Sequence, residues 1–273
     1  INQIIQEMEL PYEWLPILKR RCDERGIIFL CTPFDETAVD ELEKVGIVAY
    51  KMASYSVNNL PFLKYVASKS KPIILSTGAA DEKDIHKALA AIKSTGNEQI
   101  ALLQCTAKYP APLETVNLQV IPLLHDKFGV VAGLSDHSRE PSLAPLGAVA
   151  LGAKIVEKHF TTDNNLPGPD HGFAILDTEL VQLVKDIRNL EKCLGSEEKK
   201  VLEAEKELYE FARSRIHASR DIQAGEIFSR ENIAILRSGI RKRGLEPEYW
   251  EKVLGKTSHR NIPVGEPITM EDL

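Results

Sequence analysis

The stretch VVAGLSDHSREPSLAPLGAVALGAKIVEKHFT, residues 130–161, shows the pattern that decides the fold. An apolar run rich in β-branched residues, Val130–His137, ends in polar groups, and Lys154–Thr161 is a second run of the same kind. Between them, Ala144–Leu151 has a short helical pattern. Near-continuous apolar strands that alternate with helices are typical of a parallel sheet covered on its outside.

The same alternation extends through residues 1–190. Four further strand-like runs and four longer helical patterns precede this stretch. The strand-like runs are Ile27–Phe34, Ile47–Ser54, Pro72–Gly78 and Ile100–Thr106, and the helical patterns are Glu36–Val45, Leu60–Ser68, Glu82–Ser94 and Leu118–Phe128. Strands and helices in this order predict successive right-handed βαβ crossovers.

Such a sheet can stay open and doubly wound, or it can close into an eight-stranded barrel. An open sheet brings polar groups together at one switch point between two or three strands. A barrel gathers all the carboxyl ends of its strands around one mouth. All six runs end in small polar or ionisable groups, which favours a (β/α)8 TIM-type barrel with six of its eight units in this chain. Because the chain opens with a helix-like segment, we expect two further units to precede Ile1.

The pattern changes after the long polar helical region Leu176–Arg213. Short strand-like pieces are separated by the turns QAGE and PVGE, which is typical of a small β-rich domain. The pieces are Ser214–Ala218, Ile233–Leu236 and Lys256–Asn261. We therefore expect a barrel domain over residues 1–196, a charged linker helix beginning at Glu197 and covering 197–213, and a β-rich domain over 214–273.

The composition is that of a globular protein with a substantial core, at 43% hydrophobic and 27% charged residues. The net charge of -6 argues against a nucleic-acid partner, because that role needs a basic face. No apolar run approaches the length of a membrane span, so no membrane partner is expected. The four cysteines are scattered and follow no metal or disulfide spacing, which indicates reduced thiols and a cytoplasmic protein.

Two histidines at neighbouring strand ends form the most specific pattern. Because side chains alternate along a strand, Ser135 and His137 share one face, and Glu157 and His159 share the same face of the next strand. Adjacent strands lie about 4.8 Å apart, so both imidazoles can reach one divalent ion. Two imidazoles with open positions suit manganese, iron, cobalt or zinc better than magnesium or calcium. The structural alternative is that each histidine is only hydrogen-bonded at the rim.

A second group of strand-end residues has the chemistry of an anion site. A phosphate binds hydroxyls, an ammonium group and backbone N–H groups arranged around it. The sequence offers the hydroxyls of Thr32, Ser54, Ser76, Thr77 and Ser135 and the ammonium group of Lys51. The structural alternative is that these hydroxyls cap the helices that follow.

Two further residues lie where a second substrate would be expected. Tyr109 in AKYPAP is either a substrate contact or a packing residue at the rim. The loop LPGPDHGF, Leu166–Phe173, follows the last strand and places Asp170 and His171 over the expected mouth. There Asp170 either receives a sugar hydroxyl or caps the next helix.

These motifs together resemble the sialic-acid synthase family, which includes N-acetylneuraminate, legionaminic and pseudaminic acid synthases and related spore-coat polysaccharide proteins. The resemblance covers the whole chain. It rests on CTPFD, YKMAS, PIILSTG, LLQCTAKYPAP, GLSDHS, GAVALGAKIVEKHFT and LPGPDH, in that order. The tail, with DIQAGE and NIPVGE, resembles the antifreeze-like or SAF domain of that family.

The resemblance implies condensation of phosphoenolpyruvate with an N-acylated mannosamine-type sugar and water, giving a nine-carbon 2-keto sugar acid and phosphate. It makes His137 and His159 the ligands of a manganese ion and, with Lys51, the catalytic residues. Arg237, in ILRSG, would reach the partner's site in a domain-swapped homodimer. Its implied phosphoenolpyruvate contacts are Thr32, Lys51, Ser54, Ser76 and Ser135, and its implied sugar contacts are Tyr109 and Asp170.

The sequence departs from the family pattern in three places, and these differences leave alternative functions open. The family's first two strands contain a glutamate and a lysine with no counterpart here, so the 273-residue chain is expected to be impaired. Ser56 and Ala107 stand where relatives often have glutamate and asparagine, which leaves the sugar open. One alternative is a non-catalytic sugar-binding or assembly subunit with the same fold. Another is a condensing enzyme for a phosphorylated sugar, which would need a basic pocket near Lys108 and Lys158.

Overall fold

The computed structural model describes residues 9–239 and 243–273. The chain divides into two compact units, Ile1–Gly195 and Ser196–Leu273. Each unit has its own hydrophobic core. The two units are therefore described separately.

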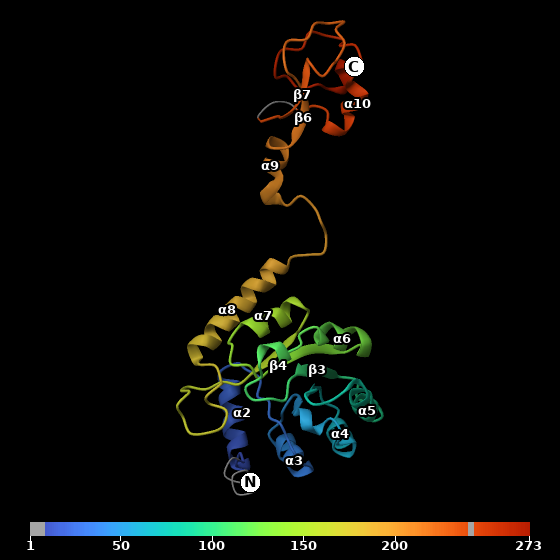
Figure 1. The fold of residues 1–273 in the computed structure, drawn as a ribbon. Coiled ribbons are helices and arrows are strands. Elements are labelled where there is room, and N and C mark those ends of the chain that lie inside the picture. The colour runs from blue at the N-terminus through green and yellow to red at the C-terminus, as the bar shows by residue number, and fades with distance from the viewer. Residues whose placement is uncertain (1–8, 240–242) are drawn as a thin grey trace. The chain divides into compact units, whose positions relative to one another are not determined.

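The first unit is built on one parallel sheet of five strands whose spatial order follows the sequence, β1-β2-β3-β4-β5 (Figure 1). A doubly wound sheet reverses its strand order at a switch point, whereas a barrel does not. The order observed confirms the predicted TIM-type α/β fold. The strands are β1 (Tyr50–Met52), β2 (Ile73–Ser76), β3 (Ile100–Cys105), β4 (Val131–Asp136) and β5 (Ile155–Lys158).

Helices join the strands and lie in succession around the sheet (Figure 1). Their starts follow capping chemistry: the Asp35 carboxylate accepts from the Ala38 amide at 2.7 Å, and Asp81 and Asp84 form a capping box. The helices are α2 (Leu15–Glu24), α3 (Glu36–Lys44), α4 (Leu60–Ala67), α5 (Glu82–Lys93), α6 (Val120–Phe128), α7 (Leu143–Ala150) and α8 (Asp177–Leu194), with short 3-10 turns η1 (Tyr12–Trp14), η2 (Ser54–Ser56) and η3 (Leu113–Thr115). Of the helix-like opening segment, residues 1–8 lie outside the described residues.

The two faces of the sheet have different chemistry. Tyr50, Ile73 and Ile100 form one row across three strands, and all three are buried in the core that the helices share. This is the outer face of the sheet. On the opposite face the register aligns Cys105, Ser135 and Glu157 in a second row. We call this second face, which also includes Lys51 and Ser76, the inner face.

The predicted strand Ile27–Phe34 does not form, and this part of the sequence prediction was wrong. Residues 27–34 have no assigned strand, and β1 pairs with β2 alone among the described strands. Ile28 and Phe34 are 70% and 72% exposed. Apolar composition favours a strand, but a strand also needs a neighbour whose N–H and C=O groups it can pair with. Without that ladder the segment stays irregular.

The second unit contains the predicted pair of short strands. β6 (Ser214–Ala218) and β7 (Ile233–Arg237) pair antiparallel, close to two of the predicted pieces. The third piece, Lys256–Asn261, is not a strand. It makes only the isolated bridge Ile227↔Thr257, because its backbone groups bond to several different segments rather than to one partner. Short helical turns complete the unit: η5 (Pro247–Tyr249), α10 (Trp250–Val253) and η6 (Met270–Asp272).

The predicted continuous linker helix is also wrong. Helix α8 ends at Leu194, and helical structure resumes only with η4 (Glu203–Glu205) and α9 (Lys206–Phe211). Neither η4 nor α9 has a buried residue. Isolated helices of this length are marginal in water, so charge alternation without a packed face does not support one long helix.

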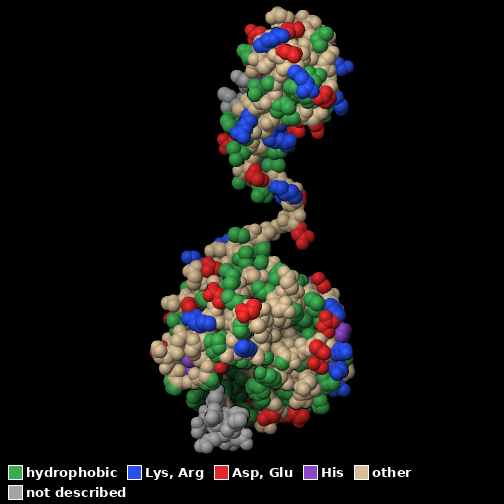
Figure 2. Space-filling view, in the orientation of Figure 1, with side chains coloured by type: hydrophobic (Ala, Val, Ile, Leu, Met, Phe, Trp, Pro, Cys, Tyr) green, Lys and Arg blue, Asp and Glu red, His purple; other side chains and the backbone are tan. Residues whose placement is uncertain are grey.

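The surface shown in Figure 2 mixes acidic and basic side chains with exposed apolar ones. Within the described parts of the chain, no helix combines the length and apolar character needed to cross a bilayer.

Candidate active site

Lys51 on β1 lies at the centre of the polar side chains of the inner face. Its ammonium group donates to Ser76 Oγ at 2.8 Å and to the Met52 carbonyl at 3.0 Å. It also pairs with Glu157 Oε2 at 3.3 Å. The side chain of Lys51 is only 10% exposed, so the structure holds a buried cation at the predicted anion site.

Glu157 on β5 is a site residue to which the sequence analysis gave no role. Its Oε1 accepts a hydrogen bond from Ser135 Oγ at 2.7 Å, while its other oxygen faces Lys51. The signal that could have found it was present: Glu157 lies two residues before His159 and therefore on the same face of the strand. Two residues predicted for one anion, Lys51 and Ser135, thus contact one carboxylate, and a third, Ser76, bonds to Lys51.

Ser54 adds a second small group of contacts beside these residues. Its hydroxyl accepts from the Gly78 amide at 2.9 Å and donates to Cys105 Sγ at 3.5 Å. A Cβ on Gly78 would lie 2.9 Å from Ser54 Oγ and 3.0 Å from Cys105 Sγ, so only glycine permits this approach. A hollow of about 120 Å³ opens here, lined by Ser54, Tyr55, Val57, Asn58, Gly78, Ala79, Ala80 and Asp84.

Two of the predicted hydroxyl donors are not joined to Lys51. Thr77 donates its hydroxyl to the Leu103 carbonyl at 2.9 Å, so it is used within the sheet. Thr32 lies in the irregular segment before α3, and its side chain makes no hydrogen bond within residues 9–239 and 243–273. The structure therefore brings together Lys51, Ser76 and Ser135, through hydrogen bonds and the Glu157 carboxylate, with Ser54 bonded to the Gly78 amide.

The two predicted histidines lie close together. The ring centroids of His137 and His159 are 5.3 Å apart, and their planes are inclined by 68°. His137 Nδ1 lies 2.8 Å from the Thr106 carbonyl oxygen, which can only accept. In the neutral ring Nδ1 is therefore the protonated nitrogen and Nε2 keeps its lone pair. His159 Nδ1 is 3.5 Å from Asp170 Oδ2.

This donor set fits a divalent ion held by two imidazoles. A backbone carbonyl that fixes one imidazole tautomer is a common arrangement around metal-ligating histidines. No group of three histidine, cysteine, aspartate or glutamate side chains placed to hold a metal occurs in the described parts of the chain. The residues therefore suit an open coordination site, which substrate or water would complete, rather than a closed structural one.

Aromatic rings enclose the histidines. Tyr109 stacks on His137 with centroids 4.1 Å apart, and Phe173 packs edge-on against His159 at 4.9 Å. Burial, followed by the negative charges of Cys105, Tyr55, Asp170 and Glu157, raises the pKa of Tyr109 to about 12. Its phenol is therefore a hydrogen-bond donor at neutral pH. Phe173 was missed, although it ends the loop that supplies Asp170.

The thiol of Cys105 lies between these two parts of the site. It is buried and lies 3.8 Å from His137 Nδ1. Burial raises the pKa of Cys105, but hydrogen bonds from His137 and Ser54 outweigh it, so the pKa falls below its ordinary value. All four cysteines are free thiols, but only Cys105 is buried: Cys22 and Cys31 are partly exposed and Cys193 is exposed.

A buried ion pair on the outer face holds together the two strands that present the histidines. Lys158 Nζ lies 2.6 Å from Asp136 Oδ2 and donates to the Ser138 carbonyl at 2.6 Å. The side chain of Lys158 is 5% exposed and that of Asp136 is 0% exposed. Because Lys158 is used in this pair, it does not supply a basic pocket for a phosphorylated sugar.

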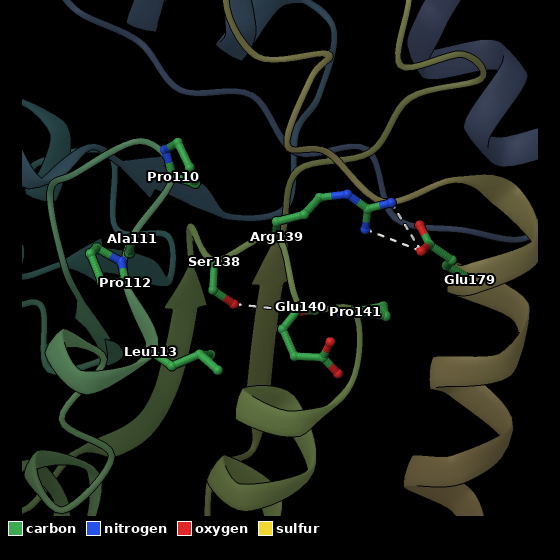
Figure 3. Close-up of a pocket in the computed structure, with 9 residues that line it drawn as sticks. All are labelled: Pro110, Ala111, Pro112, Leu113, Ser138, Arg139, Glu140, Pro141 and Glu179. Atoms are coloured by element: carbon green, nitrogen blue, oxygen red, sulfur yellow. Dashed lines mark hydrogen bonds and ion pairs between the residues drawn. The ribbon is translucent and has the colours of Figure 1, made fainter.

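A larger cavity of about 530 Å³ lies beside the site but contains none of the predicted site residues. Figure 3 shows Arg139 turned toward Glu179, and both of its terminal nitrogens donate to Glu179 Oε1 at 3.1 Å. Its cation is therefore neutralised within the cavity wall. The lining residues are Pro110, Ala111, Pro112, Leu113, Ser138, Arg139, Glu140, Pro141 and Glu179.

Arg237 belongs to the second unit. It is the last residue of β7 and is exposed. Its predicted contact with a partner's sugar stays a prediction.

Comparison with known protein families gives two matches along the chain. A family model described as the NeuB family matches residues 1–199. A second model, described as the SAF domain, matches residues 215–273.

Individual relatives agree with these matches. The Bacillus subtilis (strain 168) spore coat polysaccharide biosynthesis protein SpsE is 44% identical over 288 residues, covering 100% of this chain and 77% of the relative. Its crystal structure aligns with a TM-score of 0.65, covering 97% of this chain and 78% of that one. The N,N'-diacetyllegionaminic acid synthase of Campylobacter jejuni subsp. jejuni serotype O:2 is 38% identical, and the alignment covers 97% of this chain and 79% of the relative. The crystal structure of an N-acetylneuraminic acid synthetase from Leptospira borgpetersenii serovar Hardjo-bovis aligns with a TM-score of 0.70 at 33% identity. The alignment covers 74% of this chain and 70% of that one.

Proposed function

This chain belongs to the NeuB family and ends in a SAF domain, and from that premise we propose that it is a nonulosonate synthase. Its reaction joins phosphoenolpyruvate to an N-acylated mannosamine-type sugar and water, and yields a nine-carbon 2-keto sugar acid and phosphate. One observation supports this most strongly. Anion donors around Lys51 and the imidazoles of His137 and His159 lie at or just beyond the carboxyl ends of strands of one parallel sheet.

Lys51, Ser76 and Ser135 would bind the phosphoenolpyruvate anion. A buried ammonium group with two neighbouring hydroxyls supplies charge and directed hydrogen bonds in a site of low water content. Ser54, with the Gly78 amide, would extend the same donor set. Holding the anion in one place converts a bimolecular encounter into an oriented one, which is where most of the acceleration would arise.

His137 and His159 would hold a divalent cation, for which manganese is our first candidate. When bound, such an ion supplies Lewis-acid polarisation of the sugar's aldehyde oxygen. The Thr106 carbonyl would keep the His137 ring in the tautomer that leaves Nε2 available. The aromatic rings of Tyr109 and Phe173 would keep bulk water from the imidazoles.

The sugar would lie on the Tyr109 and Asp170 side of the histidines. Tyr109 offers a neutral phenol as donor, and Asp170 offers a carboxylate for sugar hydroxyls. We propose that Arg237 of a partner subunit adds a further contact in a domain-swapped homodimer, as the family resemblance implies.

The bonds made and broken follow from this placement. C3 of phosphoenolpyruvate forms a bond to the aldehyde carbon as the C2–C3 and the aldehyde C–O double bonds become single. Water adds its oxygen at C2, and the bond from C2 to the phosphate oxygen breaks, which leaves a ketone at C2. One proton of the water ends on the former aldehyde oxygen and the other on the phosphate. Lys51 and the hydroxyls hold the charge on the phosphate as it leaves.

A phosphate-release assay tests the proposal. The chain is incubated with manganese, phosphoenolpyruvate and either N-acetylmannosamine or a diacetamido sugar. Release that requires all three components supports a synthase. Sugar binding by calorimetry without any phosphate release would instead favour a non-catalytic sugar-binding or assembly subunit.

A further inference from the structure

We propose that Glu157 is an internal competitor for the anion site, which an incoming anion must displace from Lys51 and Ser135. This inference rests on the proposed binding of phosphoenolpyruvate at Lys51 but assigns a new role to a residue outside the predicted donor set.

Three groups surround the Lys51 ammonium group. An ammonium group has three N–H donors and no acceptor. In the structure it donates hydrogen bonds to Ser76 Oγ and the Met52 carbonyl, and its third partner is Glu157 Oε2, in an ion pair at 3.3 Å. A new anion can therefore bind Lys51 well only if one of these partners leaves.

Ser135 is in the same position. A serine hydroxyl has one proton to donate, and Ser135 gives it to Glu157 Oε1 at 2.7 Å. Two of the groups expected to hold phosphoenolpyruvate are thus committed to the two oxygens of one carboxylate. Glu157 stands in for an oxyanion of the substrate.

Glu157 is also the partner best able to move. Its side chain is 42% exposed, whereas that of Lys51 is 10% exposed, and the Met52 carbonyl is fixed in β1. A rotation of the Glu157 side chain into solvent frees both donors at once. The cost of this rotation is the modest strength of an ion pair with one exposed member, since the released carboxylate is well hydrated.

This arrangement would make the site selective. A weak, singly charged anion cannot easily displace the carboxylate, whereas phosphoenolpyruvate, which bears both a phosphate and a carboxylate, can. After reaction, the return of Glu157 to Lys51 would weaken the binding of inorganic phosphate and favour its release.

Calorimetric binding of inorganic phosphate, without metal or sugar, tests the inference in the whole chain. Glu157→Gln keeps the shape of the side chain and removes its charge, so we expect phosphate to bind roughly five- to tenfold more tightly. Glu157→Ala should shift affinity in the same direction. Glu140→Gln, which removes a carboxylate that bonds to neither Lys51 nor Ser135, should leave the affinity unchanged.

The outcomes separate this inference from the proposed function. Unchanged or weaker phosphate binding in Glu157→Gln, with binding lost in Lys51→Ala, would mean that Glu157 only supports the lysine. Undiminished phosphate binding in Lys51→Ala would instead overturn the proposed anion site itself. If the Glu157 variants do not fold, a crystal structure of the unmodified protein with phosphate decides. We expect the anion at Lys51 and Ser135 with Glu157 rotated away, and an anion bound there with both Glu157 contacts intact would refute the inference.

Discussion

Lys51 and Glu157 lie on the two outermost strands of the five-stranded sheet, yet Lys51 Nζ and Glu157 Oε2 are 3.3 Å apart. In a flat sheet, four spacings of about 4.8 Å would separate β1 from β5 by roughly 19 Å. Two side chains built from bonds of about 1.5 Å cannot span that gap. The sheet must therefore curl toward its inner face, and the curl brings residues from opposite edges into one site.

The histidine pair gives the first prediction. His137→Ala or His159→Ala should each abolish metal-dependent phosphate release and lower manganese binding by at least about tenfold, because one remaining imidazole is a weak ligand. Manganese retention is measured by electron paramagnetic resonance and folding by circular dichroism. His125→Ala, at an exposed position on α6, is the matched control. Full manganese binding in either site variant would refute the two-histidine site.

Gly78 gives a prediction about close packing. In Gly78→Ala the new Cβ would lie 2.9 Å from Ser54 Oγ and 3.0 Å from Cys105 Sγ, so these side chains must shift. We expect a loss of about 1–3 kcal/mol in the free energy of unfolding and a higher KM for phosphoenolpyruvate. Gly172→Ala, where no atom lies within 4 Å, controls for the effect on stability. Equal melting temperatures for the two variants would argue against this packing.

The buried pair between Asp136 and Lys158 gives a prediction about the support of the site. Removing one partner leaves an uncompensated buried charge, so Lys158→Met or Asp136→Asn should each cost about 3–5 kcal/mol in the free energy of unfolding of the first unit. The double variant should recover a substantial part of that loss. Urea unfolding of the four proteins measures the coupling, and additive losses would show that the two side chains act independently.

Glu226 in the second unit gives a pH-dependent prediction. Hydrogen bonds from Arg220, the Gln223 amide and Asn232 lower the pKa of Glu226 from 4.5 to about 2. A carboxyl group whose pKa is lower in the folded state stabilises the fold above its unfolded pKa and loses that effect as the pH falls toward the folded pKa. We therefore expect protection from hydrogen exchange in residues 215–273 to fall between about pH 4.5 and pH 2.

The matched variant for that prediction is Glu226→Gln. It should be less protected than the unmodified protein at pH 6, and the difference should disappear near pH 2. A difference that persists at pH 2 would mean that the Glu226 charge is not its source.

The part of the fold that could be predicted from sequence depends on local pattern. Strands near Pro72–Gly78, Ile100–Thr106 and Val130–His137 form because their apolar outer faces pack on helices with matching apolar stripes. Ile27–Phe34 has the same composition but no strand beside it. The apolar pattern of a segment does not show whether a neighbouring strand is present for it to pair with. The expected linker helix over residues 197–213 shows the converse, because charge alternation is compatible with a helix but supplies no buried face.

The site could be predicted as far as the alternation of side chains along a strand determines which face of the sheet each one lies on. The rule that residues two apart share a face placed Ser135 with His137 and Glu157 with His159 correctly. It could not show that Glu157 would meet Lys51, because that contact depends on the curl of the whole sheet. Nor could it show that Thr77 would bond to the Leu103 carbonyl, since a hydroxyl next to a strand end can turn toward either substrate or backbone.

The most direct test of the central claim is a crystal structure of the protein with manganese and phosphoenolpyruvate, with manganese located by its anomalous scattering. We predict one peak within bonding distance of a ring nitrogen of His137 and of His159, and a phosphate within hydrogen-bond distance of Lys51 Nζ. Manganese on other ligands, or phosphoenolpyruvate in the cavity beside Arg139 and Glu179, would contradict the account.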